Sequence, residues 1–460
     1  MFIEQDYQDT LDYLFSFVDY SLTKQLVYSP EKFNLDRMAR LLELMGNPHK
    51  AYPVIHVTGT KGKGSVSAFC SSVLHEAGLR TGLYTSPHLI DFNERIQVDL
   101  QPIPHLEMVE LVQKLKPVIA QVKEITTFEI ATAIAFQYFN DMKVDYAIVE
   151  VGLGGRLDAT NVVDPVLSII TTISYDHQAI LGNSIAEIAA EKAGIIKAGK
   201  PVVIASQTEE ALKVLLKTAS EKESPVTQVG MDYLYVPVSH DLDMQSLYIW
   251  PKEDQEKMNR FIEGDPENQW RPMKFEIPLL GAHQLENATT AYTALKVLQL
   301  QEPKVADGKV TAGFRNVYWP CRFDVISKRP MIILDSAHNR DSALKLRLTL
   351  DDYLPEKDVI LVFGASEDKD VRGMLVDLVP RVESVIATQS IHPRALEASV
   401  IVDYVHRMGK RAEAILPFEA AFEKAVHLAN GERAVLVAGS IFLAAAAREL
   451  WLKSGILENK

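Results

Sequence analysis

The pattern of apolar and polar positions predicts alternating strands and helices along most of the chain. Short runs of β-branched residues are each followed by a longer stretch with helical spacing of apolar residues. This alternation is typical of parallel sheets covered by helices on both faces, so we expect an α/β protein. In the first half the expected strands are 53–58, 81–85, 146–151, 166–173 and 201–205, and the expected helices are 65–77, 103–122, 128–140, 185–195 and 282–300.

The alternation is interrupted between Met231 and Leu280, where aromatic and polar residues alternate with a period of two. That period predicts a small appended sheet of half-buried antiparallel strands. Residues 301–316 are polar and contain Asp-Gly, so we expect a connector there. The second α/β pattern predicts strands 331–334, 358–363, 384–388 and 434–437, with helices 342–353, 371–379, 395–408, 417–428 and one from 441. We therefore expect domains 1–318 and 319–460, with a ligand cleft between them.

Composition and charge narrow the classes of function. The 460 residues include 48 Lys and Arg against 61 Asp and Glu, a net charge of −13. This acidic balance argues against a general binder of nucleic acid or of anionic membranes, which needs a basic surface. Cys70 and Cys321 are too far apart in sequence to suggest a disulfide framework. With no signal-peptide pattern at the start and no apolar run of spanning length, we expect a cytoplasmic protein.

The strongest local motif is HVTGTKGKGS, residues 56–65, between an expected strand and an expected helix. Gly59, Gly62 and Gly64 allow backbone N–H groups to approach an oxyanion, and the helix N-terminus adds partial positive charge. Lys63 supplies a mobile cation and Ser65 a hydroxyl. The motif departs from the strict Walker pattern, because Gly64 separates the lysine from the serine. A glycine-rich turn with an incidental lysine is the plainer interpretation, but the strand–loop–helix context favours phosphate binding.

Three further positions of the first half could serve such a site. Glu150 ends an apolar strand, where a Walker-B-like Mg²⁺ ligand lies, and the glycine-rich GLGGRLDATN follows it. His177 lies just beyond another strand end, on the side where α/β sheets bind ligands. An isolated histidine is more often a structural hydrogen-bonding residue. Lys192 falls within an expected helix, and its residue type alone predicts a solvated charge.

The second half contributes polar residues near the starts of helices and the ends of strands. Asn287 lies in the first turns of an expected helix, and Arg322 opens the second α/β pattern. Asp335 ends the strand MIIL and is followed by His338. An aspartate there can accept hydrogen bonds from ribose hydroxyls, and arginine can bind phosphate with two N–H groups. A helix cap is the plainer role for Asp335.

Taken together, the motifs resemble those of the folylpolyglutamate synthase/dihydrofolate synthase family, relatives of the Mur peptide ligases. The resemblance covers nearly the whole chain through the segments GTKGKGS, TSPHLIDFNERI, VEVGLGGRLDATNV, DHQAILG, AEKAGIIKAGKP, GAHQLENA, WPCRF, DSAHN, GASEDKD and IHPRAL. It implies a Mur-ligase-like fold, with an N-terminal P-loop ATPase domain that carries the small β insert and a C-terminal Rossmann-like domain. Two residues depart from the usual pattern: Lys61 stands where many members have asparagine, and Ser336 where glycine is usual.

The resemblance also implies roles for individual residues. Contacts to ATP fall on Gly62, Lys63, Gly64, Ser65, Asn287, Arg322, Asp335 and His338. Two Mg²⁺ ions are implied, the first held by Ser86 and Glu150 and the second by His177. Lys192 would be carbamylated, and Lys63, Glu150, His177 and Lys192 would form the catalytic set. The pterin side would be bound by Thr126, Thr127, Phe128, Glu129, Leu157, Asp158 and Ala159.

The activity implied is an ATP-dependent ligation of L-glutamate to dihydropteroate, to a reduced folate, or to both, through an acyl phosphate. The partners are then small molecules, and the protein is expected to be a monomer. Two alternatives remain open on the residues alone. One is a Mur-type ligase that uses a UDP-linked cell-wall substrate. The other is a non-catalytic nucleotide-binding module, which the joint presence of Glu150, His177 and Lys192 disfavours.

Overall fold

The computed structural model describes residues 2–18, 34–390 and 394–453. Residues 391–393, which begin the IHPRAL motif, lie outside the described residues. The chain divides into two compact units. Unit 1 comprises Met1–Pro237, Ser246–Ile277 and Leu285–Val317, and unit 2 comprises Val238–Gln245, Pro278–Gln284 and Tyr318–Lys460. The domain boundary that we expect at residue 318 stays a prediction. Unit 2 also contains two short segments from earlier in the chain.

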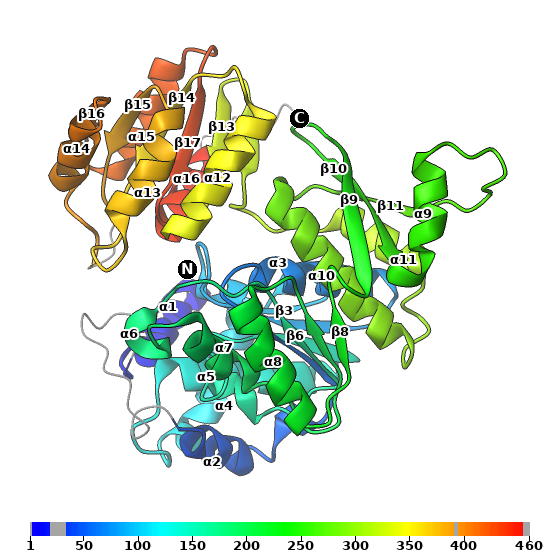
Figure 1. The fold of residues 1–460 in the computed structure, drawn as a ribbon. Helices are drawn as coiled ribbons and strands as arrows, with labels where there is room; N and C mark the ends of the chain where they lie inside the picture. Colours follow the sequence, from blue (N-terminus) through cyan, green and yellow to red (C-terminus); the bar gives the residue numbers. More distant parts are fainter. Residues whose placement is uncertain (1, 19–33, 391–393, 454–460) are drawn as a thin grey trace. The chain divides into compact units, whose positions relative to one another are not determined.

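Unit 1 is built on an eight-stranded sheet with the order β4-β3-β2-β5-β1-β6-β7-β8. Figure 1 labels β3, β6 and β8 of this sheet. Its strands are β1 Val54–Thr58, β2 Thr81–Tyr84, β3 Ile96–Val98, β4 Gln101–Pro102, β5 Tyr146–Glu150, β6 Leu167–Ile170, β7 Val202–Ile204 and β8 Val226–Gln228. The six strands from β2 to β8 in that order are parallel, while β3 and β4 pair antiparallel at one edge. The segments that follow β2, β5, β1 and β6 therefore emerge at the same edge of the sheet.

Helices pack on both sides of this sheet, since α4 and α5 share one apolar cluster and α7 and α8 another. The helices of unit 1 are α1 Phe2–Phe15, α2 Asp36–Leu44, α3 Lys63–Glu76, α4 His105–Ile119, α5 Thr127–Asp141, α6 Gln178–Leu181, α7 Ile185–Ala193, α8 Glu209–Glu221, α9 Gln255–Ile262, α10 Ala282–Gln299 and α11 Asp307–Asn316, with residues 282–284 of α10 assigned to unit 2. Ala147 and Val149 point to one side of β5 and share an apolar cluster with α4 and α5. Short 3₁₀ helices lie at Pro48–Lys50, Phe92–Arg95, Ala159–Val162 and Lys252–Asp254.

The expected connector at residues 301–316 is wrong over most of its length, because Asp307–Asn316 forms α11. Its polarity is that of a helix with one buried face, formed by Val310, Gly313 and Phe314. At Gly313 a Cβ atom would collide with Val73 of α3, and Ser72 Oγ donates a hydrogen bond to the Gly313 carbonyl at 2.7 Å. The Asp-Gly pair starts the helix instead of forming a free turn.

A three-stranded sheet, β11-β10-β9, carries the period-two segment. Its strands are β9 Tyr233–His240, β10 Gln245–Pro251 and β11 Met273–Ile277. The four-residue loop between β9 and β10 requires an antiparallel hairpin, as the period of two predicts. The charged stretch between β10 and β11 contains α9. The hairpin belongs to both units, since unit 1 ends at Pro237 and resumes at Ser246.

Unit 2 has a six-stranded sheet with the order β12-β13-β17-β14-β15-β16. The strands are β12 Asp324–Lys328, β13 Met331–Leu334, β14 Val359–Phe363, β15 Ser384–Ala387, β16 Arg411–Ala414 and β17 Ala434–Ala438, all parallel except β12. The helices are α12 Arg340–Tyr353, α13 Val371–Leu378, α14 Ala398–Arg407, α15 Phe418–Ala429 and α16 Ile441–Lys453, with a 3₁₀ turn at Val379–Arg381. In the described residues, no helix is both long and apolar enough to cross a membrane.

The short segments 238–245 and 278–284 are tied into unit 2 by a buried hydrogen-bond network. The Tyr353 hydroxyl donates to Gln245 Oε1 at 2.9 Å and accepts from the Gly281 N–H at 3.3 Å. The Gln245 side-chain amide donates in turn to the Gly281 carbonyl at 3.0 Å. These contacts explain why residues so far apart in sequence belong to one compact body.

Candidate active site

The glycine-rich loop runs from the end of β1 into α3 and has the backbone that its glycines allow. Gly59 and Gly62 adopt φ angles of 149° and 90°. A Cβ atom on Gly59 would collide with Thr171, and one on Gly62 with Oδ1 of Asn287. The structure thus brings Asn287 of α10 against the loop, as we expect for residues of one nucleotide site. Gly64 and Ser65 lie in the first turn of α3, with Ser65 buried.

Two lysines from distant parts of unit 1 converge on one carbonyl group of this loop. Lys63 Nζ donates to the Gly59 oxygen at 3.3 Å, and Lys192 Nζ donates to the same oxygen at 2.9 Å. Lys63 Nζ also lies 4.0 Å from Glu150 Oε1. Residue type alone predicts a solvated Lys192, but its side chain is buried against the glycine-rich loop.

Burial has a direct electrostatic consequence for Lys192. It lowers the pKa of this lysine to about 7, and the neighbouring positive charge of Lys63 adds to the effect. Asp176 and Asp158 act in the opposite direction, and Lys61 lowers the pKa further. A large share of Lys192 is therefore a neutral amine near pH 7, the form that reacts with electrophiles.

Glu150 and Ser86 meet at the carboxyl ends of β5 and β2. The Ser86 N–H donates to Glu150 Oε2 at 3.3 Å, and the Glu150 side chain is buried. Among the side chains that the structure describes, no three His, Cys, Asp or Glu residues gather into a metal cage. The single buried carboxylate of Glu150 fits Mg²⁺, which takes one or two carboxylates and completes its shell with water and phosphate oxygens.

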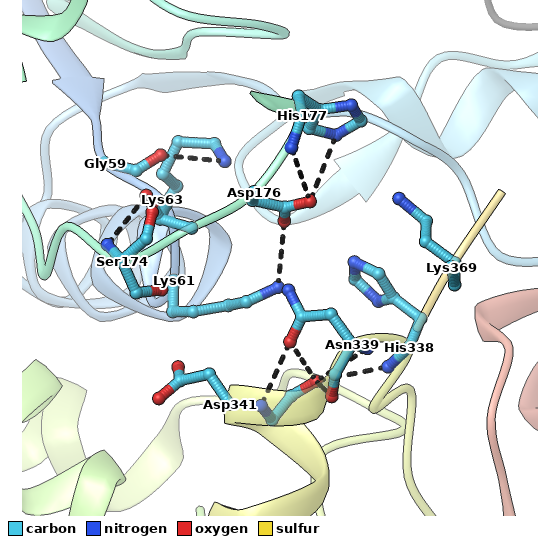
Figure 2. A network of polar contacts seen from close by, with 12 residues as sticks. Gly59, Lys61, Lys63, Ser174, Asp176, His177, His338, Asn339, Asp341 and Lys369 are labelled. Carbon is cyan, nitrogen blue, oxygen red and sulfur yellow. Dashed lines mark hydrogen bonds and ion pairs between the residues drawn. The ribbon is translucent and has the colours of Figure 1, made fainter. Parts of the chain in front are cut away.

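His177 follows β6 and is held in a left-handed conformation, with φ of 48°. Its N–H donates to Asp176 Oδ1 at 3.0 Å, and Asp176 Oδ2 pairs with Lys61 Nζ at 3.2 Å (Figure 2). Lys61, the departure from the family pattern, therefore links the glycine loop to the Asp-His segment. The sequence reasoning missed Asp176, although its place beside His177 after a strand end was a usable signal.

The segment Thr126–Glu129 begins α5 and is occupied by structural contacts. Thr126 and Glu129 form a reciprocal cap, in which Glu129 Oε2 accepts from the Thr126 N–H at 2.8 Å. Glu129 also pairs with Arg37 Nε at 3.2 Å, and the Thr127 hydroxyl donates to the Leu14 carbonyl at 2.9 Å. The Phe128 ring abuts Gly152, where a Cβ atom would collide with it.

The second expected pterin segment, Leu157–Ala159, is centred on a buried carboxylate. Asp158 accepts from the Leu153 N–H at 2.9 Å and from the Thr160 N–H at 3.0 Å. Burial raises the pKa of Asp158, while these hydrogen bonds oppose the rise. Leu157 is partly buried and Ala159 packs in the apolar cluster beneath α5. Phe128 and Asp158 therefore both contact the Gly152–Gly155 loop.

In unit 2, Arg322 stands between two residues with unusual backbone angles. Cys321 and Phe323 have φ of 59° and 47° and are buried. Arg322 Nη1 donates to the Cys321 carbonyl at 3.0 Å and contacts the Ser336 hydroxyl. Ser336 is not among the residues with positive φ, so the glycine usual there is not required by the backbone.

Asp335 and His338 follow β13 and flank this turn. Asp335 Oδ2 accepts from the Phe323 N–H at 2.8 Å, and Oδ1 accepts from the Ala337 N–H at 2.8 Å. Burial raises the pKa of Asp335, against the effect of Arg322. The helix cap is Asn339 instead, whose side chain accepts from the Ser342 N–H at 3.0 Å (Figure 2). His338 Nδ1 lies 2.8 Å from the Ser336 carbonyl oxygen.

A separate cavity of about 280 Å³ lies beneath the three-stranded sheet in unit 1. It is lined by aromatic residues such as Trp250, Trp270 and Tyr292. None of the site residues that we expect from the sequence lines it.

Comparisons with known proteins identify the family. The Mur ligase middle domain matches residues 57–295, and the Mur ligase glutamate ligase domain matches residues 321–441. The Bacillus subtilis dihydrofolate synthase/folylpolyglutamate synthase is 35% identical over 398 residues, covering 84% of this chain and 89% of that protein. The chain belongs to the folylpolyglutamate synthase/dihydrofolate synthase family. The family, its Mur-ligase-like α/β fold and its class of ATP-dependent ligase are thus confirmed.

Two further relatives define how far this likeness extends. A solved structure, Escherichia coli FolC in complex with DHPP and ADP, has a TM-score of 0.81 and 28% identity, covering 97% of this chain and 98% of that one. A Haloferax volcanii relative, a probable bifunctional folylpolyglutamate synthase/dihydropteroate synthase, is 35% identical over 91% of this chain. The chain spans 48% of that protein's length, about half.

Proposed function

We propose that this chain uses ATP to join the amino group of L-glutamate to the carboxylate of dihydropteroate, of a reduced folate, or of both. One observation carries the proposal: Lys63 and Lys192 both donate to the Gly59 carbonyl of a glycine loop, beside the buried carboxylate of Glu150. The Lys63 cation and the buried Lys192 amine, next to a carboxylate of a kind that binds Mg²⁺, suit the transfer of a phosphoryl group.

The choice of substrate is supported by the relatives. The Bacillus subtilis relative carries both synthase names, and the Escherichia coli structure contains DHPP and ADP. The pterin would be held by the two segments that begin at Thr126 and Leu157, whose residues Phe128 and Asp158 both contact the Gly152–Gly155 loop. The nucleotide phosphates would lie on the Gly62–Ser65 helix start, where free N–H groups and the helix dipole favour anions.

In the first step a substrate carboxylate oxygen attacks the γ-phosphorus of ATP, which gives an acyl phosphate and releases ADP. Lys63 would stabilise the negative charge on the transferred oxygens. In the second step the amine of glutamate attacks the acyl carbon, phosphate leaves and the nitrogen loses a proton. Mg²⁺, with Ser86 and Glu150 at a first site and His177 at a second, would screen the phosphate charge when bound.

Lys192 is proposed to act as a carbamate. Its neutral amine would add to CO₂ with loss of one proton, which converts a buried amine into an anionic oxygen ligand. The pKa of about 7 and the burial of this lysine support that reaction. A monomeric state and a cytoplasmic location, which we expect from the sequence, belong to the same proposal.

The test is phosphate release from ATP by the full chain, measured with dihydropteroate and with tetrahydrofolate as acceptors. We expect release that requires both glutamate and a pterin acceptor, and the acceptor with the higher kcat/KM identifies the preferred activity. Equal release without any pterin would contradict the proposal. Activity only with a UDP-linked peptide precursor would favour a Mur-type cell-wall ligase instead.

A further inference from the structure

The turn that presents Arg322 is held in a backbone conformation that its residues disfavour. Cys321 and Phe323, on either side of the arginine, both have positive φ. A bulky side chain such as that of Phe323 is rarely found there, because its Cβ approaches the neighbouring carbonyl oxygen. Such angles persist where surrounding contacts over-determine them, and they concentrate at functional sites.

Two carboxylates hold this turn, one for each unusual residue. Asp324 Oδ2 accepts from the Cys321 N–H at 3.1 Å, and Asp335 Oδ2 accepts from the Phe323 N–H at 2.8 Å. The Ser336 N–H closes the turn further by donating to the Cys321 carbonyl at 3.0 Å. Removing either carboxylate would leave a backbone N–H without that partner and would release one side of the turn.

Asp324 is itself fixed by an arginine from the last helix of unit 2. Arg448 Nη1 of α16 lies 3.0 Å from Asp324 Oδ2, and both side chains are mostly buried. Arg448 also contacts the Tyr318 hydroxyl, with its guanidinium 5.6 Å from the centre of the Tyr318 ring. A partly buried ion pair of this kind restrains the carboxylate more than an exposed pair would.

We propose that Asp324 and Arg448 are positioning residues, which hold the Cys321–Phe323 turn so that the Arg322 guanidinium is preset for a nucleotide phosphate. The chain of contacts runs from Arg448 to Asp324, to the Cys321 N–H, and then to Arg322. This inference rests on the proposed function and on the nucleotide contact that the family resemblance implies for Arg322. It assigns a nucleotide-dependent role to a helix of unit 2 in which none of the nucleotide-site motifs falls.

The test is a double-mutant cycle on ADP affinity, measured by titration calorimetry of the full chain with Mg²⁺ and ADP. We expect Arg448→Met to weaken binding by roughly 5-fold and Arg322→Ala by roughly 10-fold or more. The double variant should bind no more weakly than Arg322→Ala alone, because Arg448 acts through Arg322. Losses that multiply in the double variant, or no effect of Arg448→Met, would overturn the proposal.

Three controls separate positioning from damage to the fold. Arg448→Lys keeps a cation beside Asp324 and should recover part of the affinity. Tyr318→Phe removes only the hydroxyl contact and should leave ADP binding unchanged. Arg433→Met breaks the ion pair with Glu383, which lies 2.5 Å away elsewhere in unit 2, and should also leave binding unchanged. If the three control variants lost as much ADP affinity as Arg448→Met, the loss would reflect general destabilisation and would refute the inference.

The inference and the proposed function can fail separately. If the wild-type chain shows no glutamate ligation but the ADP cycle gives the expected coupling, the proposed activity is wrong and the positioning role stands. If ligation occurs and the losses in ADP affinity of the Arg448 and Arg322 variants multiply, the proposed activity stands and the positioning role is wrong. Should Arg448→Met fail to fold, Asp324→Asn replaces it, because the amide keeps its shape and loses the charge that pairs with Arg448.

Discussion

The glycine loop of unit 1 carries Lys63, and the Cys321–Phe323 turn of unit 2 carries Arg322. The two segments reach their backbone conformations in opposite ways. The loop reaches positive φ at Gly59 and Gly62, where no side chain opposes it. The turn reaches positive φ at Cys321 and Phe323, against the preference of both residues. Glycines make the loop conformation inherently accessible, whereas carboxylates from neighbouring segments must hold the turn. The conformation of the glycine loop is therefore determined locally, whereas that of the Cys321–Phe323 turn depends on the packing of unit 2.

The comparison shows which kind of site a sequence displays. A loop whose backbone requires glycine has glycines in its own sequence, so the motif is recognisable from the sequence. The positive φ angles of a turn that other residues hold in place cannot be predicted from the residues of the turn. It follows that substitutions in the loop should act locally and strongly, while substitutions around the turn should act in graded steps that depend on Arg322.

The largest effect should come from Lys63→Ala. Removing a cation beside the transferred phosphoryl group should lower kcat for ligation by roughly 10²- to 10³-fold. Steady-state phosphate release measures this loss. Lys213→Ala removes an exposed lysine of α8 and should keep wild-type activity. A Lys63→Ala protein with more than a tenth of the wild-type rate would show that the loop is not the phosphate site.

Gly62→Ala should come next, because it both strains the loop and drives a methyl group into Asn287. We expect ADP affinity to fall by about 10-fold or more and the free energy of unfolding to fall by about 2 kcal/mol. Gly78→Ala has a similar positive φ of 75° with nothing within 4 Å, so it isolates the backbone strain. It should cost about 1 kcal/mol in denaturant unfolding and leave ADP affinity intact. Equal ADP losses in both variants would contradict a local role.

Lys192 offers a pH test, since its side chain is buried and its amine donates to the Gly59 carbonyl oxygen. The pKa falls from 10.5 to about 7 on folding, so between these pH values the unfolded chain binds the extra proton. Stability of the wild type relative to Lys192→Met should therefore rise with pH from about 7 to about 10.5, by at most about 1.4 kcal/mol per unit. Chemical denaturation in CO₂-free buffers measures it. A flat difference would mean that Lys192 is charged in the folded protein.

The same two proteins test the carbamate when bicarbonate is restored. We expect wild-type ligation to increase with added bicarbonate near pH 7, while Lys192→Met should remain inactive at every concentration. Mass spectrometry after trapping of the carbamate provides a second readout. Wild-type turnover by Lys192→Met would remove the proposed role of this residue.

The smallest effect should be that of Ser336→Gly, which restores the residue usual in the family. The substitution removes the hydroxyl that contacts Arg322 and donates to the Cys321 carbonyl at 3.0 Å. We expect ADP binding to weaken by roughly 2- to 5-fold, in line with the loss of one hydrogen bond. In the Arg322→Ala background the substitution should have no effect on affinity. A loss there as large as in the wild type would mean that Ser336 acts independently of Arg322.

Periodicity and motifs predicted the two α/β patterns, the small antiparallel sheet and the glycine loop. They failed at α11, where a polar surface concealed the buried face around Gly313, because a residue without a side chain adds no apolar signal. Periodicity and residue type gave no account of Lys192, which only the resemblance to the family singled out, because its side chain is buried where it reaches the Gly59 carbonyl after β1. Asp324 and Arg448 lie 124 positions apart, so their pairing is visible only once β12 and α16 are folded.

The chain passes between unit 1 and unit 2 several times, which limits how chimeras with a relative can be built. Tyr353 is satisfied by Gln245 and Gly281, which come from segments far upstream of β12. A chimera joined to a relative at residue 318 alone would exchange the C-terminal lobe without these partners. A compatible exchange has to include residues 238–245 and 278–284 as well. Unit 2 therefore has to be exchanged as three separate segments of the gene and not as one continuous segment.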